Sequence, residues 1–316
     1  MRKVVLLYNP RLTAAEPFAR DLARQLEASS SVQTVVASVW DEDTVRATAP
    51  GAEFAVTLGG DGTVLRAARL VAPLGLPLVG VNLGKLGFLT ELGRREAARK
   101  LPMFVGQNCW VEERILLSVQ VERRAKLAQG DWTFPGEPRV ETYLAVNEVV
   151  AGRAALARAV DITITIDDTH LANYIADGVI VSTPTGSTAY SLAAGGPILH
   201  PQLENLILTP ILPHLASAYP LVCPPGVVIR IEVTTGHQAG LTIDGQIEGP
   251  LYNGDLLELR AAPQRVRFLR AQVPTYFYQT LANRLRRESQ HDLTDASEER
   301  VSRDLGDVAR SQGRAR

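Results

Sequence analysis

The sequence predicts an α/β domain with an open parallel sheet of the Rossmann-like kind, followed by an all-β layered domain. Over the first 105 residues, apolar runs of strand length alternate with segments of helical spacing. Beyond residue 105 the apolar runs are short, Gly, Pro, Asn and Asp separate them, and helical spacing is scarce. The first pattern is typical of a parallel sheet covered on both faces, and the second of a layered β domain.

In the first domain, strands are expected at residues 4–8, 32–39, 54–58 and 78–81. Phe18, Leu22 and Leu26 are spaced as one face of a helix between the first two strands. Helical spacing recurs at residues 63–71, directly after the third strand. Because strand and helix alternate in this order, the strands are expected to run parallel.

In the second domain the sequence predicts strands joined by turns and one hairpin loop at residues 125–138. The expected strands are residues 115–122, 142–150, 160–166, 178–182, 227–233, 241–243 and 256–259. Leu281 and Leu285, four apart, predict a helix at about 275–287 that returns to pack on the first domain. The α/β domain is therefore assigned residues 1–105 with this helix, and the β-rich domain residues 106–274. Residues 288–316 are charged and predict a disordered tail.

Composition narrows the possible partners and location. The 316 residues suffice for two domains, and a net charge of −1 argues against nucleic acid or an anionic membrane as partner. No run approaches the ~20 apolar residues of a membrane span, and the apolar run at residues 4–8 is too short for a signal peptide. Cys109 and Cys223 predict neither a disulfide nor a metal site. We expect a cytoplasmic protein.

The first candidate site is the glycine-rich loop Gly59-Gly60-Asp61-Gly62-Thr63, between a predicted strand and a predicted helix. Glycine amides and a helix N-terminus favour a bound anion at the carboxyl edge of such a sheet. A carboxylate would repel phosphate, so Asp61 suggests a general base or a contact to Mg²⁺ beside a phosphoryl group. The alternative is a tight turn in which Asp61 only caps the helix.

The second candidate is the segment 177–191, DGVIVSTPTGSTAYS, in which seven of fifteen side chains carry hydroxyls. Hydroxyls on a bent backbone suit hydrogen bonds to sugar hydroxyls and to a carboxamide. The alternative is a polar turn whose Ser and Thr side chains bond their own backbone.

Two shorter motifs complete the set. Asn147-Glu148 ends an apolar run, and an amide beside a carboxylate suits two neighbouring ribose hydroxyls. A turn or a bulge is the alternative. Asp244-Gly245-Gln246 lies between apolar runs and is typical of a hairpin turn.

Taken together, these motifs resemble the NAD kinase family over roughly residues 1–285. The resemblance is carried, in order and spacing, by GGDGT at 59–63, GKLGFLTEL at 84–92, NEVV at 147–150, DGVIVSTPTGSTAYSLAAGGPI at 177–198 and DGQ at 244–246. GGDGT alone is shared with diacylglycerol and sphingosine kinases, whereas the threonine-rich segment is specific. The resemblance implies transfer of the γ-phosphate of ATP to the 2′-hydroxyl of the adenosine ribose of NAD, giving NADP, in a crevice between the two domains.

The resemblance also implies roles for particular residues. Asp61 corresponds to the catalytic base, and no metal site is implied by protein ligands alone, since Mg²⁺ would come with ATP. The implied NAD-binding residues are Asp61, Gly62, Phe88, Asn147, Glu148, Arg158, Asp177, Thr188, Ala189, Tyr190, Ser191, Leu192, Ala193 and Gln246. The implied phosphate-donor residues are Gly59, Gly60, Gly62, Thr63 and Arg66.

One position departs from the family pattern, and several properties stay open. Ile175 stands where members often carry Arg or Lys, so a charge contact to NAD or to a neighbouring subunit is in doubt, unless Arg153 or Arg158 replaces it. The donor (ATP or polyphosphate), the acceptor (NAD or NADH), feedback by NADP, and assembly as a homodimer or homotetramer are not decided. A lipid or sphingoid-base kinase, or a non-catalytic NAD(P) sensor, is the alternative function.

Overall fold

The computed structural model describes residues 2–84, 87–124, 132–154, 158–213, 219–284 and 286. The chain forms two compact units, residues 1–271 and 272–316, so the predicted return helix falls in the second unit and residues 1–105 and 106–271 fall in the first. In the second unit, residues 276–284 are helical, within the helix predicted at 275–287. Packing of that helix on the first domain stays a prediction, and the predicted tail at 288–316 lies outside the described residues.

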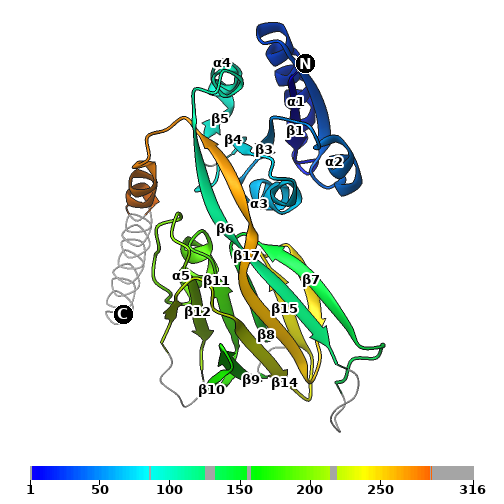
Figure 1. Cartoon of the computed structure of the whole chain (residues 1–316), viewed down its shortest axis with the longest axis vertical. Helices are drawn as coiled ribbons and strands as arrows, with labels where there is room; N and C mark the ends of the chain where they lie inside the picture. Colours follow the sequence, from blue (N-terminus) through cyan, green and yellow to red (C-terminus); the bar gives the residue numbers. More distant parts are fainter. Residues whose placement is uncertain are drawn as a thin grey trace, which may run out of the picture. The chain divides into compact units, whose positions relative to one another are not determined.

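The N-terminal part has a parallel sheet, as predicted (Figure 1), and its strand order is β2-β1-β3-β4. Its elements are β1 (Arg2–Tyr8), α1 (Ala15–Ser29), β2 (Val32–Ser38), α2 (Glu42–Thr48), β3 (Phe54–Gly59), α3 (Asp61–Val71), η1 (Ala72–Leu74), β4 (Leu78–Asn82), β5 (Leu92–Gly93) and α4 (Arg94–Val105). The predicted strands and helices are confirmed. The sequence did not predict α2, which buries one residue, Val45, or α4, which contains Pro102.

Both faces of this parallel sheet are covered. In β1, Val5 and Leu7 pack into the core shared with α2 and α3, whereas Val4 and Leu6 pack into the core shared with α1 and α4. All four side chains are fully buried. Because β3, β4 and the centre of β1 are buried on both faces, their sequences are nearly continuous apolar runs, whereas the edge strand β2 carries an exposed Gln33.

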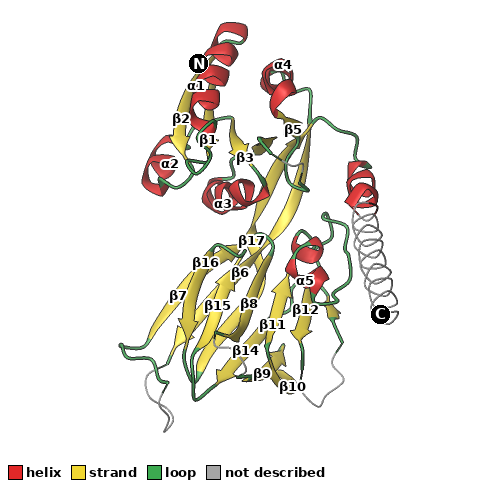
Figure 2. Cartoon of the chain, turned by 180° about the vertical axis from the view of Figure 1, so that it is seen from behind, coloured by secondary structure: helices red, strands yellow, loops and turns green. Residues whose placement is uncertain are grey.

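From Trp110 to Arg270 the first unit consists mainly of strands (Figure 2). They are β6 (Trp110–Arg123), β7 (Arg139–Ala145), β8 (Glu148–Arg153), β9 (Val160–Ile166), β10 (Thr169–Ala176), β11 (Gly178–Ser182), β12 (Leu206–Ile211), β13 (Leu221–Cys223), β14 (Ile229–Thr234), β15 (Ala239–Ile243), β16 (Ile247–Leu251) and β17 (Asp255–Arg270), with η2 (Gly186–Thr188) and α5 (Tyr190–Ala193) after β11. One sheet has the order β13-β12-β11-β8-β15-β16, and a shared apolar core packs it against β6, β9, β14 and β17 of the other sheet.

The prediction of one strand at residues 142–150 was wrong in detail. The chain leaves β7, in one sheet, and enters β8, in the other, at Val146 and Asn147. Alternating hydrophobicity is the same whether a chain stays in one sheet or crosses to another, so the sequence pattern could not reveal the crossing. Strands β10, β12, β13 and β16 were also not predicted.

The two predicted parts share one mixed sheet of 11 strands. The long strand β17 pairs with β14 and β6 in the β-rich part, and its Phe268 pairs in parallel with Leu78 of β4. In Figure 1, β6 and β17 run together from the β-rich part to the α/β part. The predicted fold class is confirmed, and this shared sheet adds a direct connection between its two parts.

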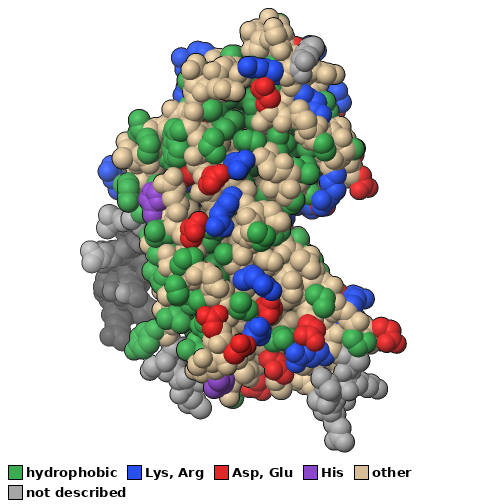
Figure 3. Space-filling model, viewed as in Figure 1, with side chains coloured by type: hydrophobic (Ala, Val, Ile, Leu, Met, Phe, Trp, Pro, Cys, Tyr) green, Lys and Arg blue, Asp and Glu red, His purple; other side chains and the backbone are tan. Residues whose placement is uncertain are grey.

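The charged side chains of the visible face are mixed rather than segregated. Figure 3 shows Lys and Arg interspersed with Asp and Glu over that face. Among the described residues, no helix is long and apolar enough to cross a membrane. Exposed ion pairs such as Arg24–Asp21 are each worth ~0–1 kcal/mol, so they do not determine the fold.

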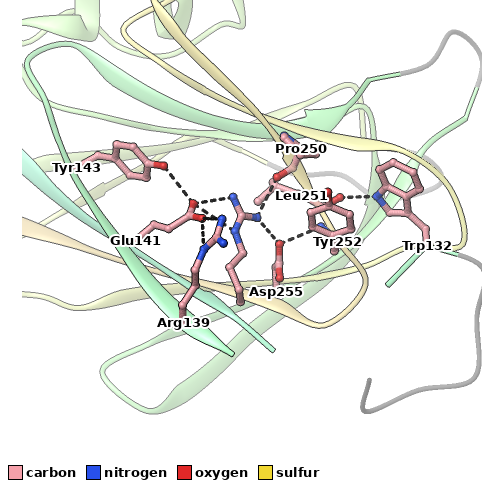
Figure 4. A network of polar contacts seen from close by, with 9 residues as sticks. Trp132, Arg139, Glu141, Tyr143, Pro250, Leu251, Tyr252 and Asp255 are labelled. Atoms are coloured by element: carbon pink, nitrogen blue, oxygen red, sulfur yellow. Dashed lines mark hydrogen bonds and ion pairs between the residues drawn. The ribbon is translucent and has the colours of Figure 1, made fainter. Parts of the chain in front are cut away.

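A buried polar network fastens the end of the β6–β7 hairpin to β16 and β17 (Figure 4). Arg123 donates hydrogen bonds to Asp255, to Glu141 and to the carbonyl oxygen of Pro250. The side chains of Arg123 and Asp255 are 5% and 0% exposed. Burial opposes ionisation of Glu141, but hydrogen bonds from Arg123 and Arg139 outweigh it and lower its pKa to about 2.

We expect Arg123→Met to lower the free energy of unfolding by about 3–5 kcal/mol, because it leaves two carboxylates without their buried partner. Denaturant unfolding at neutral pH measures this loss. Arg139→Met is the matched control: Arg139 bonds the same Glu141, but its side chain is 60% exposed. That control should lose no more than about 1 kcal/mol. Equal losses in the two variants would contradict the assignment of the network's stabilising role to Arg123.

Candidate functional site

The glycine-rich loop places Asp61 at the first turn of α3, with its carboxylate directed away from that helix. Gly60 is the N-cap residue, and no side chain caps the helix. The carboxylate of Asp61 instead accepts hydrogen bonds from the backbone N–H groups of Phe88 (2.8 Å) and Leu89 (3.1 Å). A Cβ atom on Gly87 would lie 2.1 Å from both carboxylate oxygens. The interpretation of Asp61 as a helix cap is therefore wrong.

A cavity of about 330 Å³ lies beside this loop. It is lined by Asn9, Arg11, Trp40, Gly60, Gly62, Thr63, Arg66, Gly245 and Gln246, with no carboxylate among them. The guanidinium groups of Arg11 and Arg66 lie 5.1 and 4.9 Å from the centroid of the Trp40 ring. Arg66 also pairs with Glu42 at 3.3 Å. Two guanidinium groups beside a helix N-terminus form a surface suited to phosphate oxygens.

Thr63 lines this cavity, and Gly59 lies against the Thr63 side chain. The hydroxyl of Thr63 accepts a hydrogen bond from the amide of Asn9 (3.1 Å), and Thr63 is buried. A Cβ atom on Gly59 would lie 2.1 Å from that hydroxyl oxygen, so only glycine fits at the end of β3. The predicted donor residues Gly59, Gly60, Gly62, Thr63 and Arg66 are therefore close together.

Asp244 connects the crossing between β7 and β8 to helix α3. Its carboxylate, fully buried, accepts hydrogen bonds from the N–H groups of Val146, Asn147 and Glu148. It also forms an ion pair with Arg69 of α3, whose side chain is 9% exposed. The backbone φ angles of Asp244 and Gly245 are 51° and 61°, which confirms the predicted hairpin turn.

Gln246 bonds the same helix from the other side of the turn. Its amide nitrogen donates to the carbonyl oxygen of Gly62 (2.6 Å), and its amide oxygen accepts from Arg69 (2.7 Å). The Asp-Gly-Gln turn thus contacts the glycine-rich loop directly. Gln246 lines the cavity beside Gly62 and Arg66.

In the threonine-rich segment, several hydroxyls hold the loop in shape. Thr183 donates to the carbonyl oxygen of Val146 (2.6 Å), Ser187 donates to that of Pro184 (2.6 Å), and buried Ser191 shares a hydrogen bond with Thr209 (3.1 Å). Of these three, only Ser187 bonds the backbone of its own loop, as the alternative expects, whereas Thr183 and Ser191 bond other segments of the chain. A Cβ atom on Gly186 would lie 2.2 Å from the carbonyl oxygen of Asn147, so this loop lies directly against Asn147.

Two buried oxygen atoms here, Glu148 Oε2 and Thr185 Oγ1, have no hydrogen-bond partner among the described residues. Glu148 is 7% exposed. Burial raises its pKa to about 8, and the nearby charge of Asp244 adds to this rise, whereas a hydrogen bond from the Tyr190 N–H opposes it. Buried polar atoms without a partner are rare and suggest a place for a polar ligand.

The remaining predicted NAD-binding residues are not all in one place. Asp177 precedes β11 and Thr183 follows it, so this extended strand separates them by roughly 15–20 Å. Asp177 and Tyr190 line a second cavity of about 620 Å³ with Arg153, whose guanidinium lies 2.9 Å from the Asp177 carboxylate. Arg153 thus pairs with Asp177, two residues after Ile175, whose side chain is 56% exposed.

The other predicted positions differ in their exposure. Arg158 and Ala193 are exposed, whereas Phe88, Thr188, Ala189 and Leu192 are half-buried. The sequence interpretation missed Asn9, Arg11 and Trp40, and did not expect a buried role for Arg69 or Asp244. Asn9 and Arg11 directly follow the first predicted strand, so the rule that ligands gather at carboxyl ends of parallel strands was a usable signal.

The pKa of Glu148 gives stability a pH dependence with a definite sign. The carboxyl ionises near pH 4.5 when unfolded and near pH 8 when folded, so the folded state binds the extra proton between these values. Stability contributed by this group is therefore lost as pH rises from about 4.5 to about 8. The difference in the free energy of unfolding, Glu148→Gln minus wild type, should therefore be more positive at about pH 9 than at about pH 5, by about a few kcal/mol.

Denaturant unfolding at the two pH values measures this difference. Glu113→Gln is the control, because the Glu113 side chain is 52% exposed. The difference in the free energy of unfolding between this variant and the wild type should be the same at both pH values. A Glu148→Gln difference that is the same at both pH values would contradict a raised pKa.

Comparison with known proteins gives a consistent result. Residues 4–108 match the ATP-NAD kinase N-terminal domain, and residues 146–271 match the ATP-NAD kinase C-terminal domain. The chain is 36% identical to the NAD kinase of Dehalococcoides mccartyi over 285 residues, which cover 90% of this chain and 96% of that protein. It is 43% identical to the NAD kinase of Koribacter versatilis over 235 residues, 74% of this chain and 78% of the relative.

Two solved structures share the fold at 23% sequence identity. Yeast NADH kinase complexed with NADH has a TM-score of 0.70 and covers 86% of this chain, with 84% of its own chain matched. An NAD kinase from Archaeoglobus fulgidus in complex with ATP has a TM-score of 0.67, with 89% of this chain and 97% of that chain matched. Together with the domain matches and the sequence identities, these similarities show that the chain belongs to the NAD kinase family.

Proposed function

We propose that this chain transfers the γ-phosphate of ATP to the 2′-hydroxyl of the adenosine ribose of NAD, giving NADP, with Asp61 as general base. One observation supports this most strongly. Gln246 contacts Gly62, and its neighbour Asp244 holds the amides of Asn147 and Glu148. A single hairpin turn thereby ties the phosphate-binding loop to the pair of residues suited to a ribose.

The acceptor ribose is proposed to bind beside Asn147 and Glu148. The buried oxygens of Glu148 and Thr185, without described partners, would bond to its hydroxyls. Phe88 and the loop 188–193 would hold the rest of NAD, with Tyr190 and Asp177 contributing from the larger cavity. Phe88 also donates its N–H to Asp61, so a ligand against Phe88 would lie near the base.

The donor is proposed to bind in the 330 Å³ cavity, with its phosphates against Gly60, Gly62, Thr63 and the Arg66 guanidinium. Arg11 lies in the same wall and would add a second cation. Among the described residues, no group of three or more His, Cys, Asp or Glu side chains is placed to hold a metal ion. Mg²⁺ usually binds through one or two carboxylates plus substrate phosphates, and Asp61, whose chain neighbours Gly60 and Gly62 line this cavity, would supply such a carboxylate. Bound Mg²⁺ would neutralise charge on the donor phosphates.

The chemistry requires positioning and a proton acceptor. A ribose hydroxyl is a weak nucleophile, and phosphoryl transfer depends mainly on alignment and charge neutralisation. Asp61 would accept the hydroxyl proton as the ribose oxygen attacks the γ-phosphorus and the bond from that phosphorus to the bridging oxygen breaks, which releases ADP. Two backbone N–H groups fix the Asp61 carboxylate. Helix α3 and the guanidinium groups would stabilise charge on the transferred phosphoryl group.

The family assignment argues against a lipid kinase. Binding of NAD(P) without transfer is the second alternative, and an assay of NADP formation with ATP and Mg²⁺ separates it from the proposal. Use of polyphosphate, use of NADH, feedback by NADP, a cytoplasmic location and assembly as a homodimer or homotetramer stay predictions from the sequence.

We expect Asp61→Asn to keep NAD binding and to lower turnover by about 10²-fold or more, since general-base assistance contributes ~10²–10⁴-fold. A coupled assay of NADP formation measures turnover, and calorimetry measures NAD affinity. The control is Asp43→Asn, in the first turn of α2, which should leave both quantities unchanged. Near-normal turnover in Asp61→Asn would remove Asp61 from the role of base.

We expect Arg11→Met to raise the KM for ATP about tenfold while the KM for NAD changes little, because a charge-assisted contact to phosphate is lost. Steady-state kinetics with each substrate varied in turn gives both values. Arg24→Met, on the exposed side of α1, is the control. An unchanged KM for ATP, or an equal rise for both substrates, would argue against donor binding in this cavity.

A further inference from the structure

Two arginines and two glutamates form a buried cluster where β17 ends. Glu91, Glu112, Arg114 and Arg270 are 4%, 1%, 3% and 0% exposed. Glu112 of β6 is paired with Phe268 of β17 in the strand register, two residues before Arg270. Both guanidinium groups lie over the Phe268 ring, 5.0 Å (Arg114) and 4.9 Å (Arg270) from its centroid.

Arg270 links this cluster to the segment that precedes β5. Its Nε atom donates to Glu112 (2.8 Å), and one terminal nitrogen lies 3.2 Å from both the Leu89 carbonyl oxygen and the Glu91 carboxylate. Glu91 also accepts from the N–H of Ala271 (2.8 Å), and its own N–H donates to the Gly80 carbonyl oxygen of β4 (2.8 Å). The segment is therefore fastened to both β17 and β4.

The same segment holds Asp61 on its other side. The N–H of Leu89 donates to the Asp61 carboxylate, while the carbonyl oxygen of Leu89 accepts from Arg270. One residue thus connects the two side chains through its backbone. Gly87 lies so close to the Asp61 carboxylate that a methyl group would collide with it, so the segment has little freedom to shift while Asp61 stays in place.

We propose that Arg270 is a positioning residue for the reaction: it holds residues 88–91 so that the N–H groups of Phe88 and Leu89 orient the Asp61 carboxylate. This inference rests on the proposed role of Asp61 as base. Arginine is required because its planar fork binds a carbonyl and two carboxylates at once, whereas a lysine ammonium is a single point charge on a flexible stem. Burying four charges is costly, and well-packed apolar side chains often serve stability equally well. We therefore infer that the cluster serves to fix the position of residues 88–91 rather than to stabilise the fold.

The chain offers a matched control on the same pair of strands. Arg123, near the opposite end of the β6–β17 pair, is another buried arginine that binds two carboxylates, Asp255 and Glu141 (Figure 4). Its described hydrogen bonds go to β7, β16 and β17, it also lies over the ring of Tyr252, and none of these contacts involves residues 87–91. Arg123→Lys therefore also removes a buried guanidinium group, but it leaves the contacts of residues 87–91 intact.

The test compares Arg270→Lys with Arg123→Lys in the full chain, measuring Tm, kcat and the Kd values for NAD and ATP. Both variants should lower Tm. We expect Arg270→Lys to lower kcat about 10–100-fold with both Kd values within about twofold of the wild type, because small misplacements of catalytic groups cost up to about 10²-fold. Arg123→Lys should keep a near-normal kcat.

If Arg270 acts by positioning Asp61, the loss of kcat in Arg270→Lys should depend on the presence of the Asp61 carboxylate. In an Asp61→Asn background, Arg270→Lys should lower the residual turnover by less than about twofold, since residues that act through one another are not additive. An undiminished loss in that background, an unchanged kcat in Arg270→Lys, or equal losses of kcat in the two lysine variants would overturn the inference. Near-normal turnover of Asp61→Asn alone would instead refute the proposed function.

Glu91→Gln keeps the proposal testable if Arg270→Lys does not fold. It retains the shape of the side chain and removes the charge that binds Arg270 and the Ala271 N–H. We expect the same signature: a lower kcat, nearly unchanged Kd values, and no further loss beside Asp61→Asn. A kcat equal to that of the wild type in folded Glu91→Gln would overturn the inference.

Discussion

The buried carboxylate of Asp244 is the interaction on which the rest of the site depends. It accepts hydrogen bonds from three consecutive amides at the crossing between the two sheets and pairs with Arg69 of α3. A buried carboxylate without these partners would be strongly destabilising, so the crossing and the helix are constrained together. Through this one group, the α/β part and the β-rich part present their polar residues to the same region.

Polar contacts of this kind, and not the apolar cores, determine the details of the site. The three apolar cores explain why the sheets and helices form. Such cores tolerate apolar substitutions that conserve the volume of the side chain. The orientation of Asp61 depends on two backbone N–H groups, and the place of Asn147 depends on Asp244 and on the close approach of Gly186. Each of these contacts joins segments that are far apart in the sequence.

Much of this arrangement could be predicted from the sequence. The parallel strands and the glycine-rich loop were recognisable because burial on both faces and the need for glycine leave clear local patterns. The partners of Asp61 were not, because Phe88 and Leu89 contact it through their backbones, which any residue type provides. Asp244 looked like an ordinary hairpin residue, and Arg69 like one more charged position on a helix. Composition also could not tell which hydroxyls of the segment 182–191 bond within the loop and which point toward a ligand.

The buried charged groups of this chain have different roles. Glu148 combines burial with an oxygen that has no described partner, a state that costs stability and is typical of a site kept ready for a ligand. The clusters around Arg123 and Arg270 lie on the same two strands, yet only the second contacts the segment that holds Asp61 among the contacts described. Similar chemistry therefore fastens a hairpin at one end and supports the proposed base at the other.

The most direct measurement is a crystal structure of this protein with NAD and a non-hydrolysable ATP analogue bound together. We expect the 2′-hydroxyl oxygen of the adenosine ribose to lie about 2.6–3.2 Å from a carboxylate oxygen of Asp61, with the analogue's phosphates in the cavity lined by Arg11 and Gly62. A ribose bound elsewhere, or a 2′-hydroxyl turned away from Asp61 in the complete complex, would contradict it.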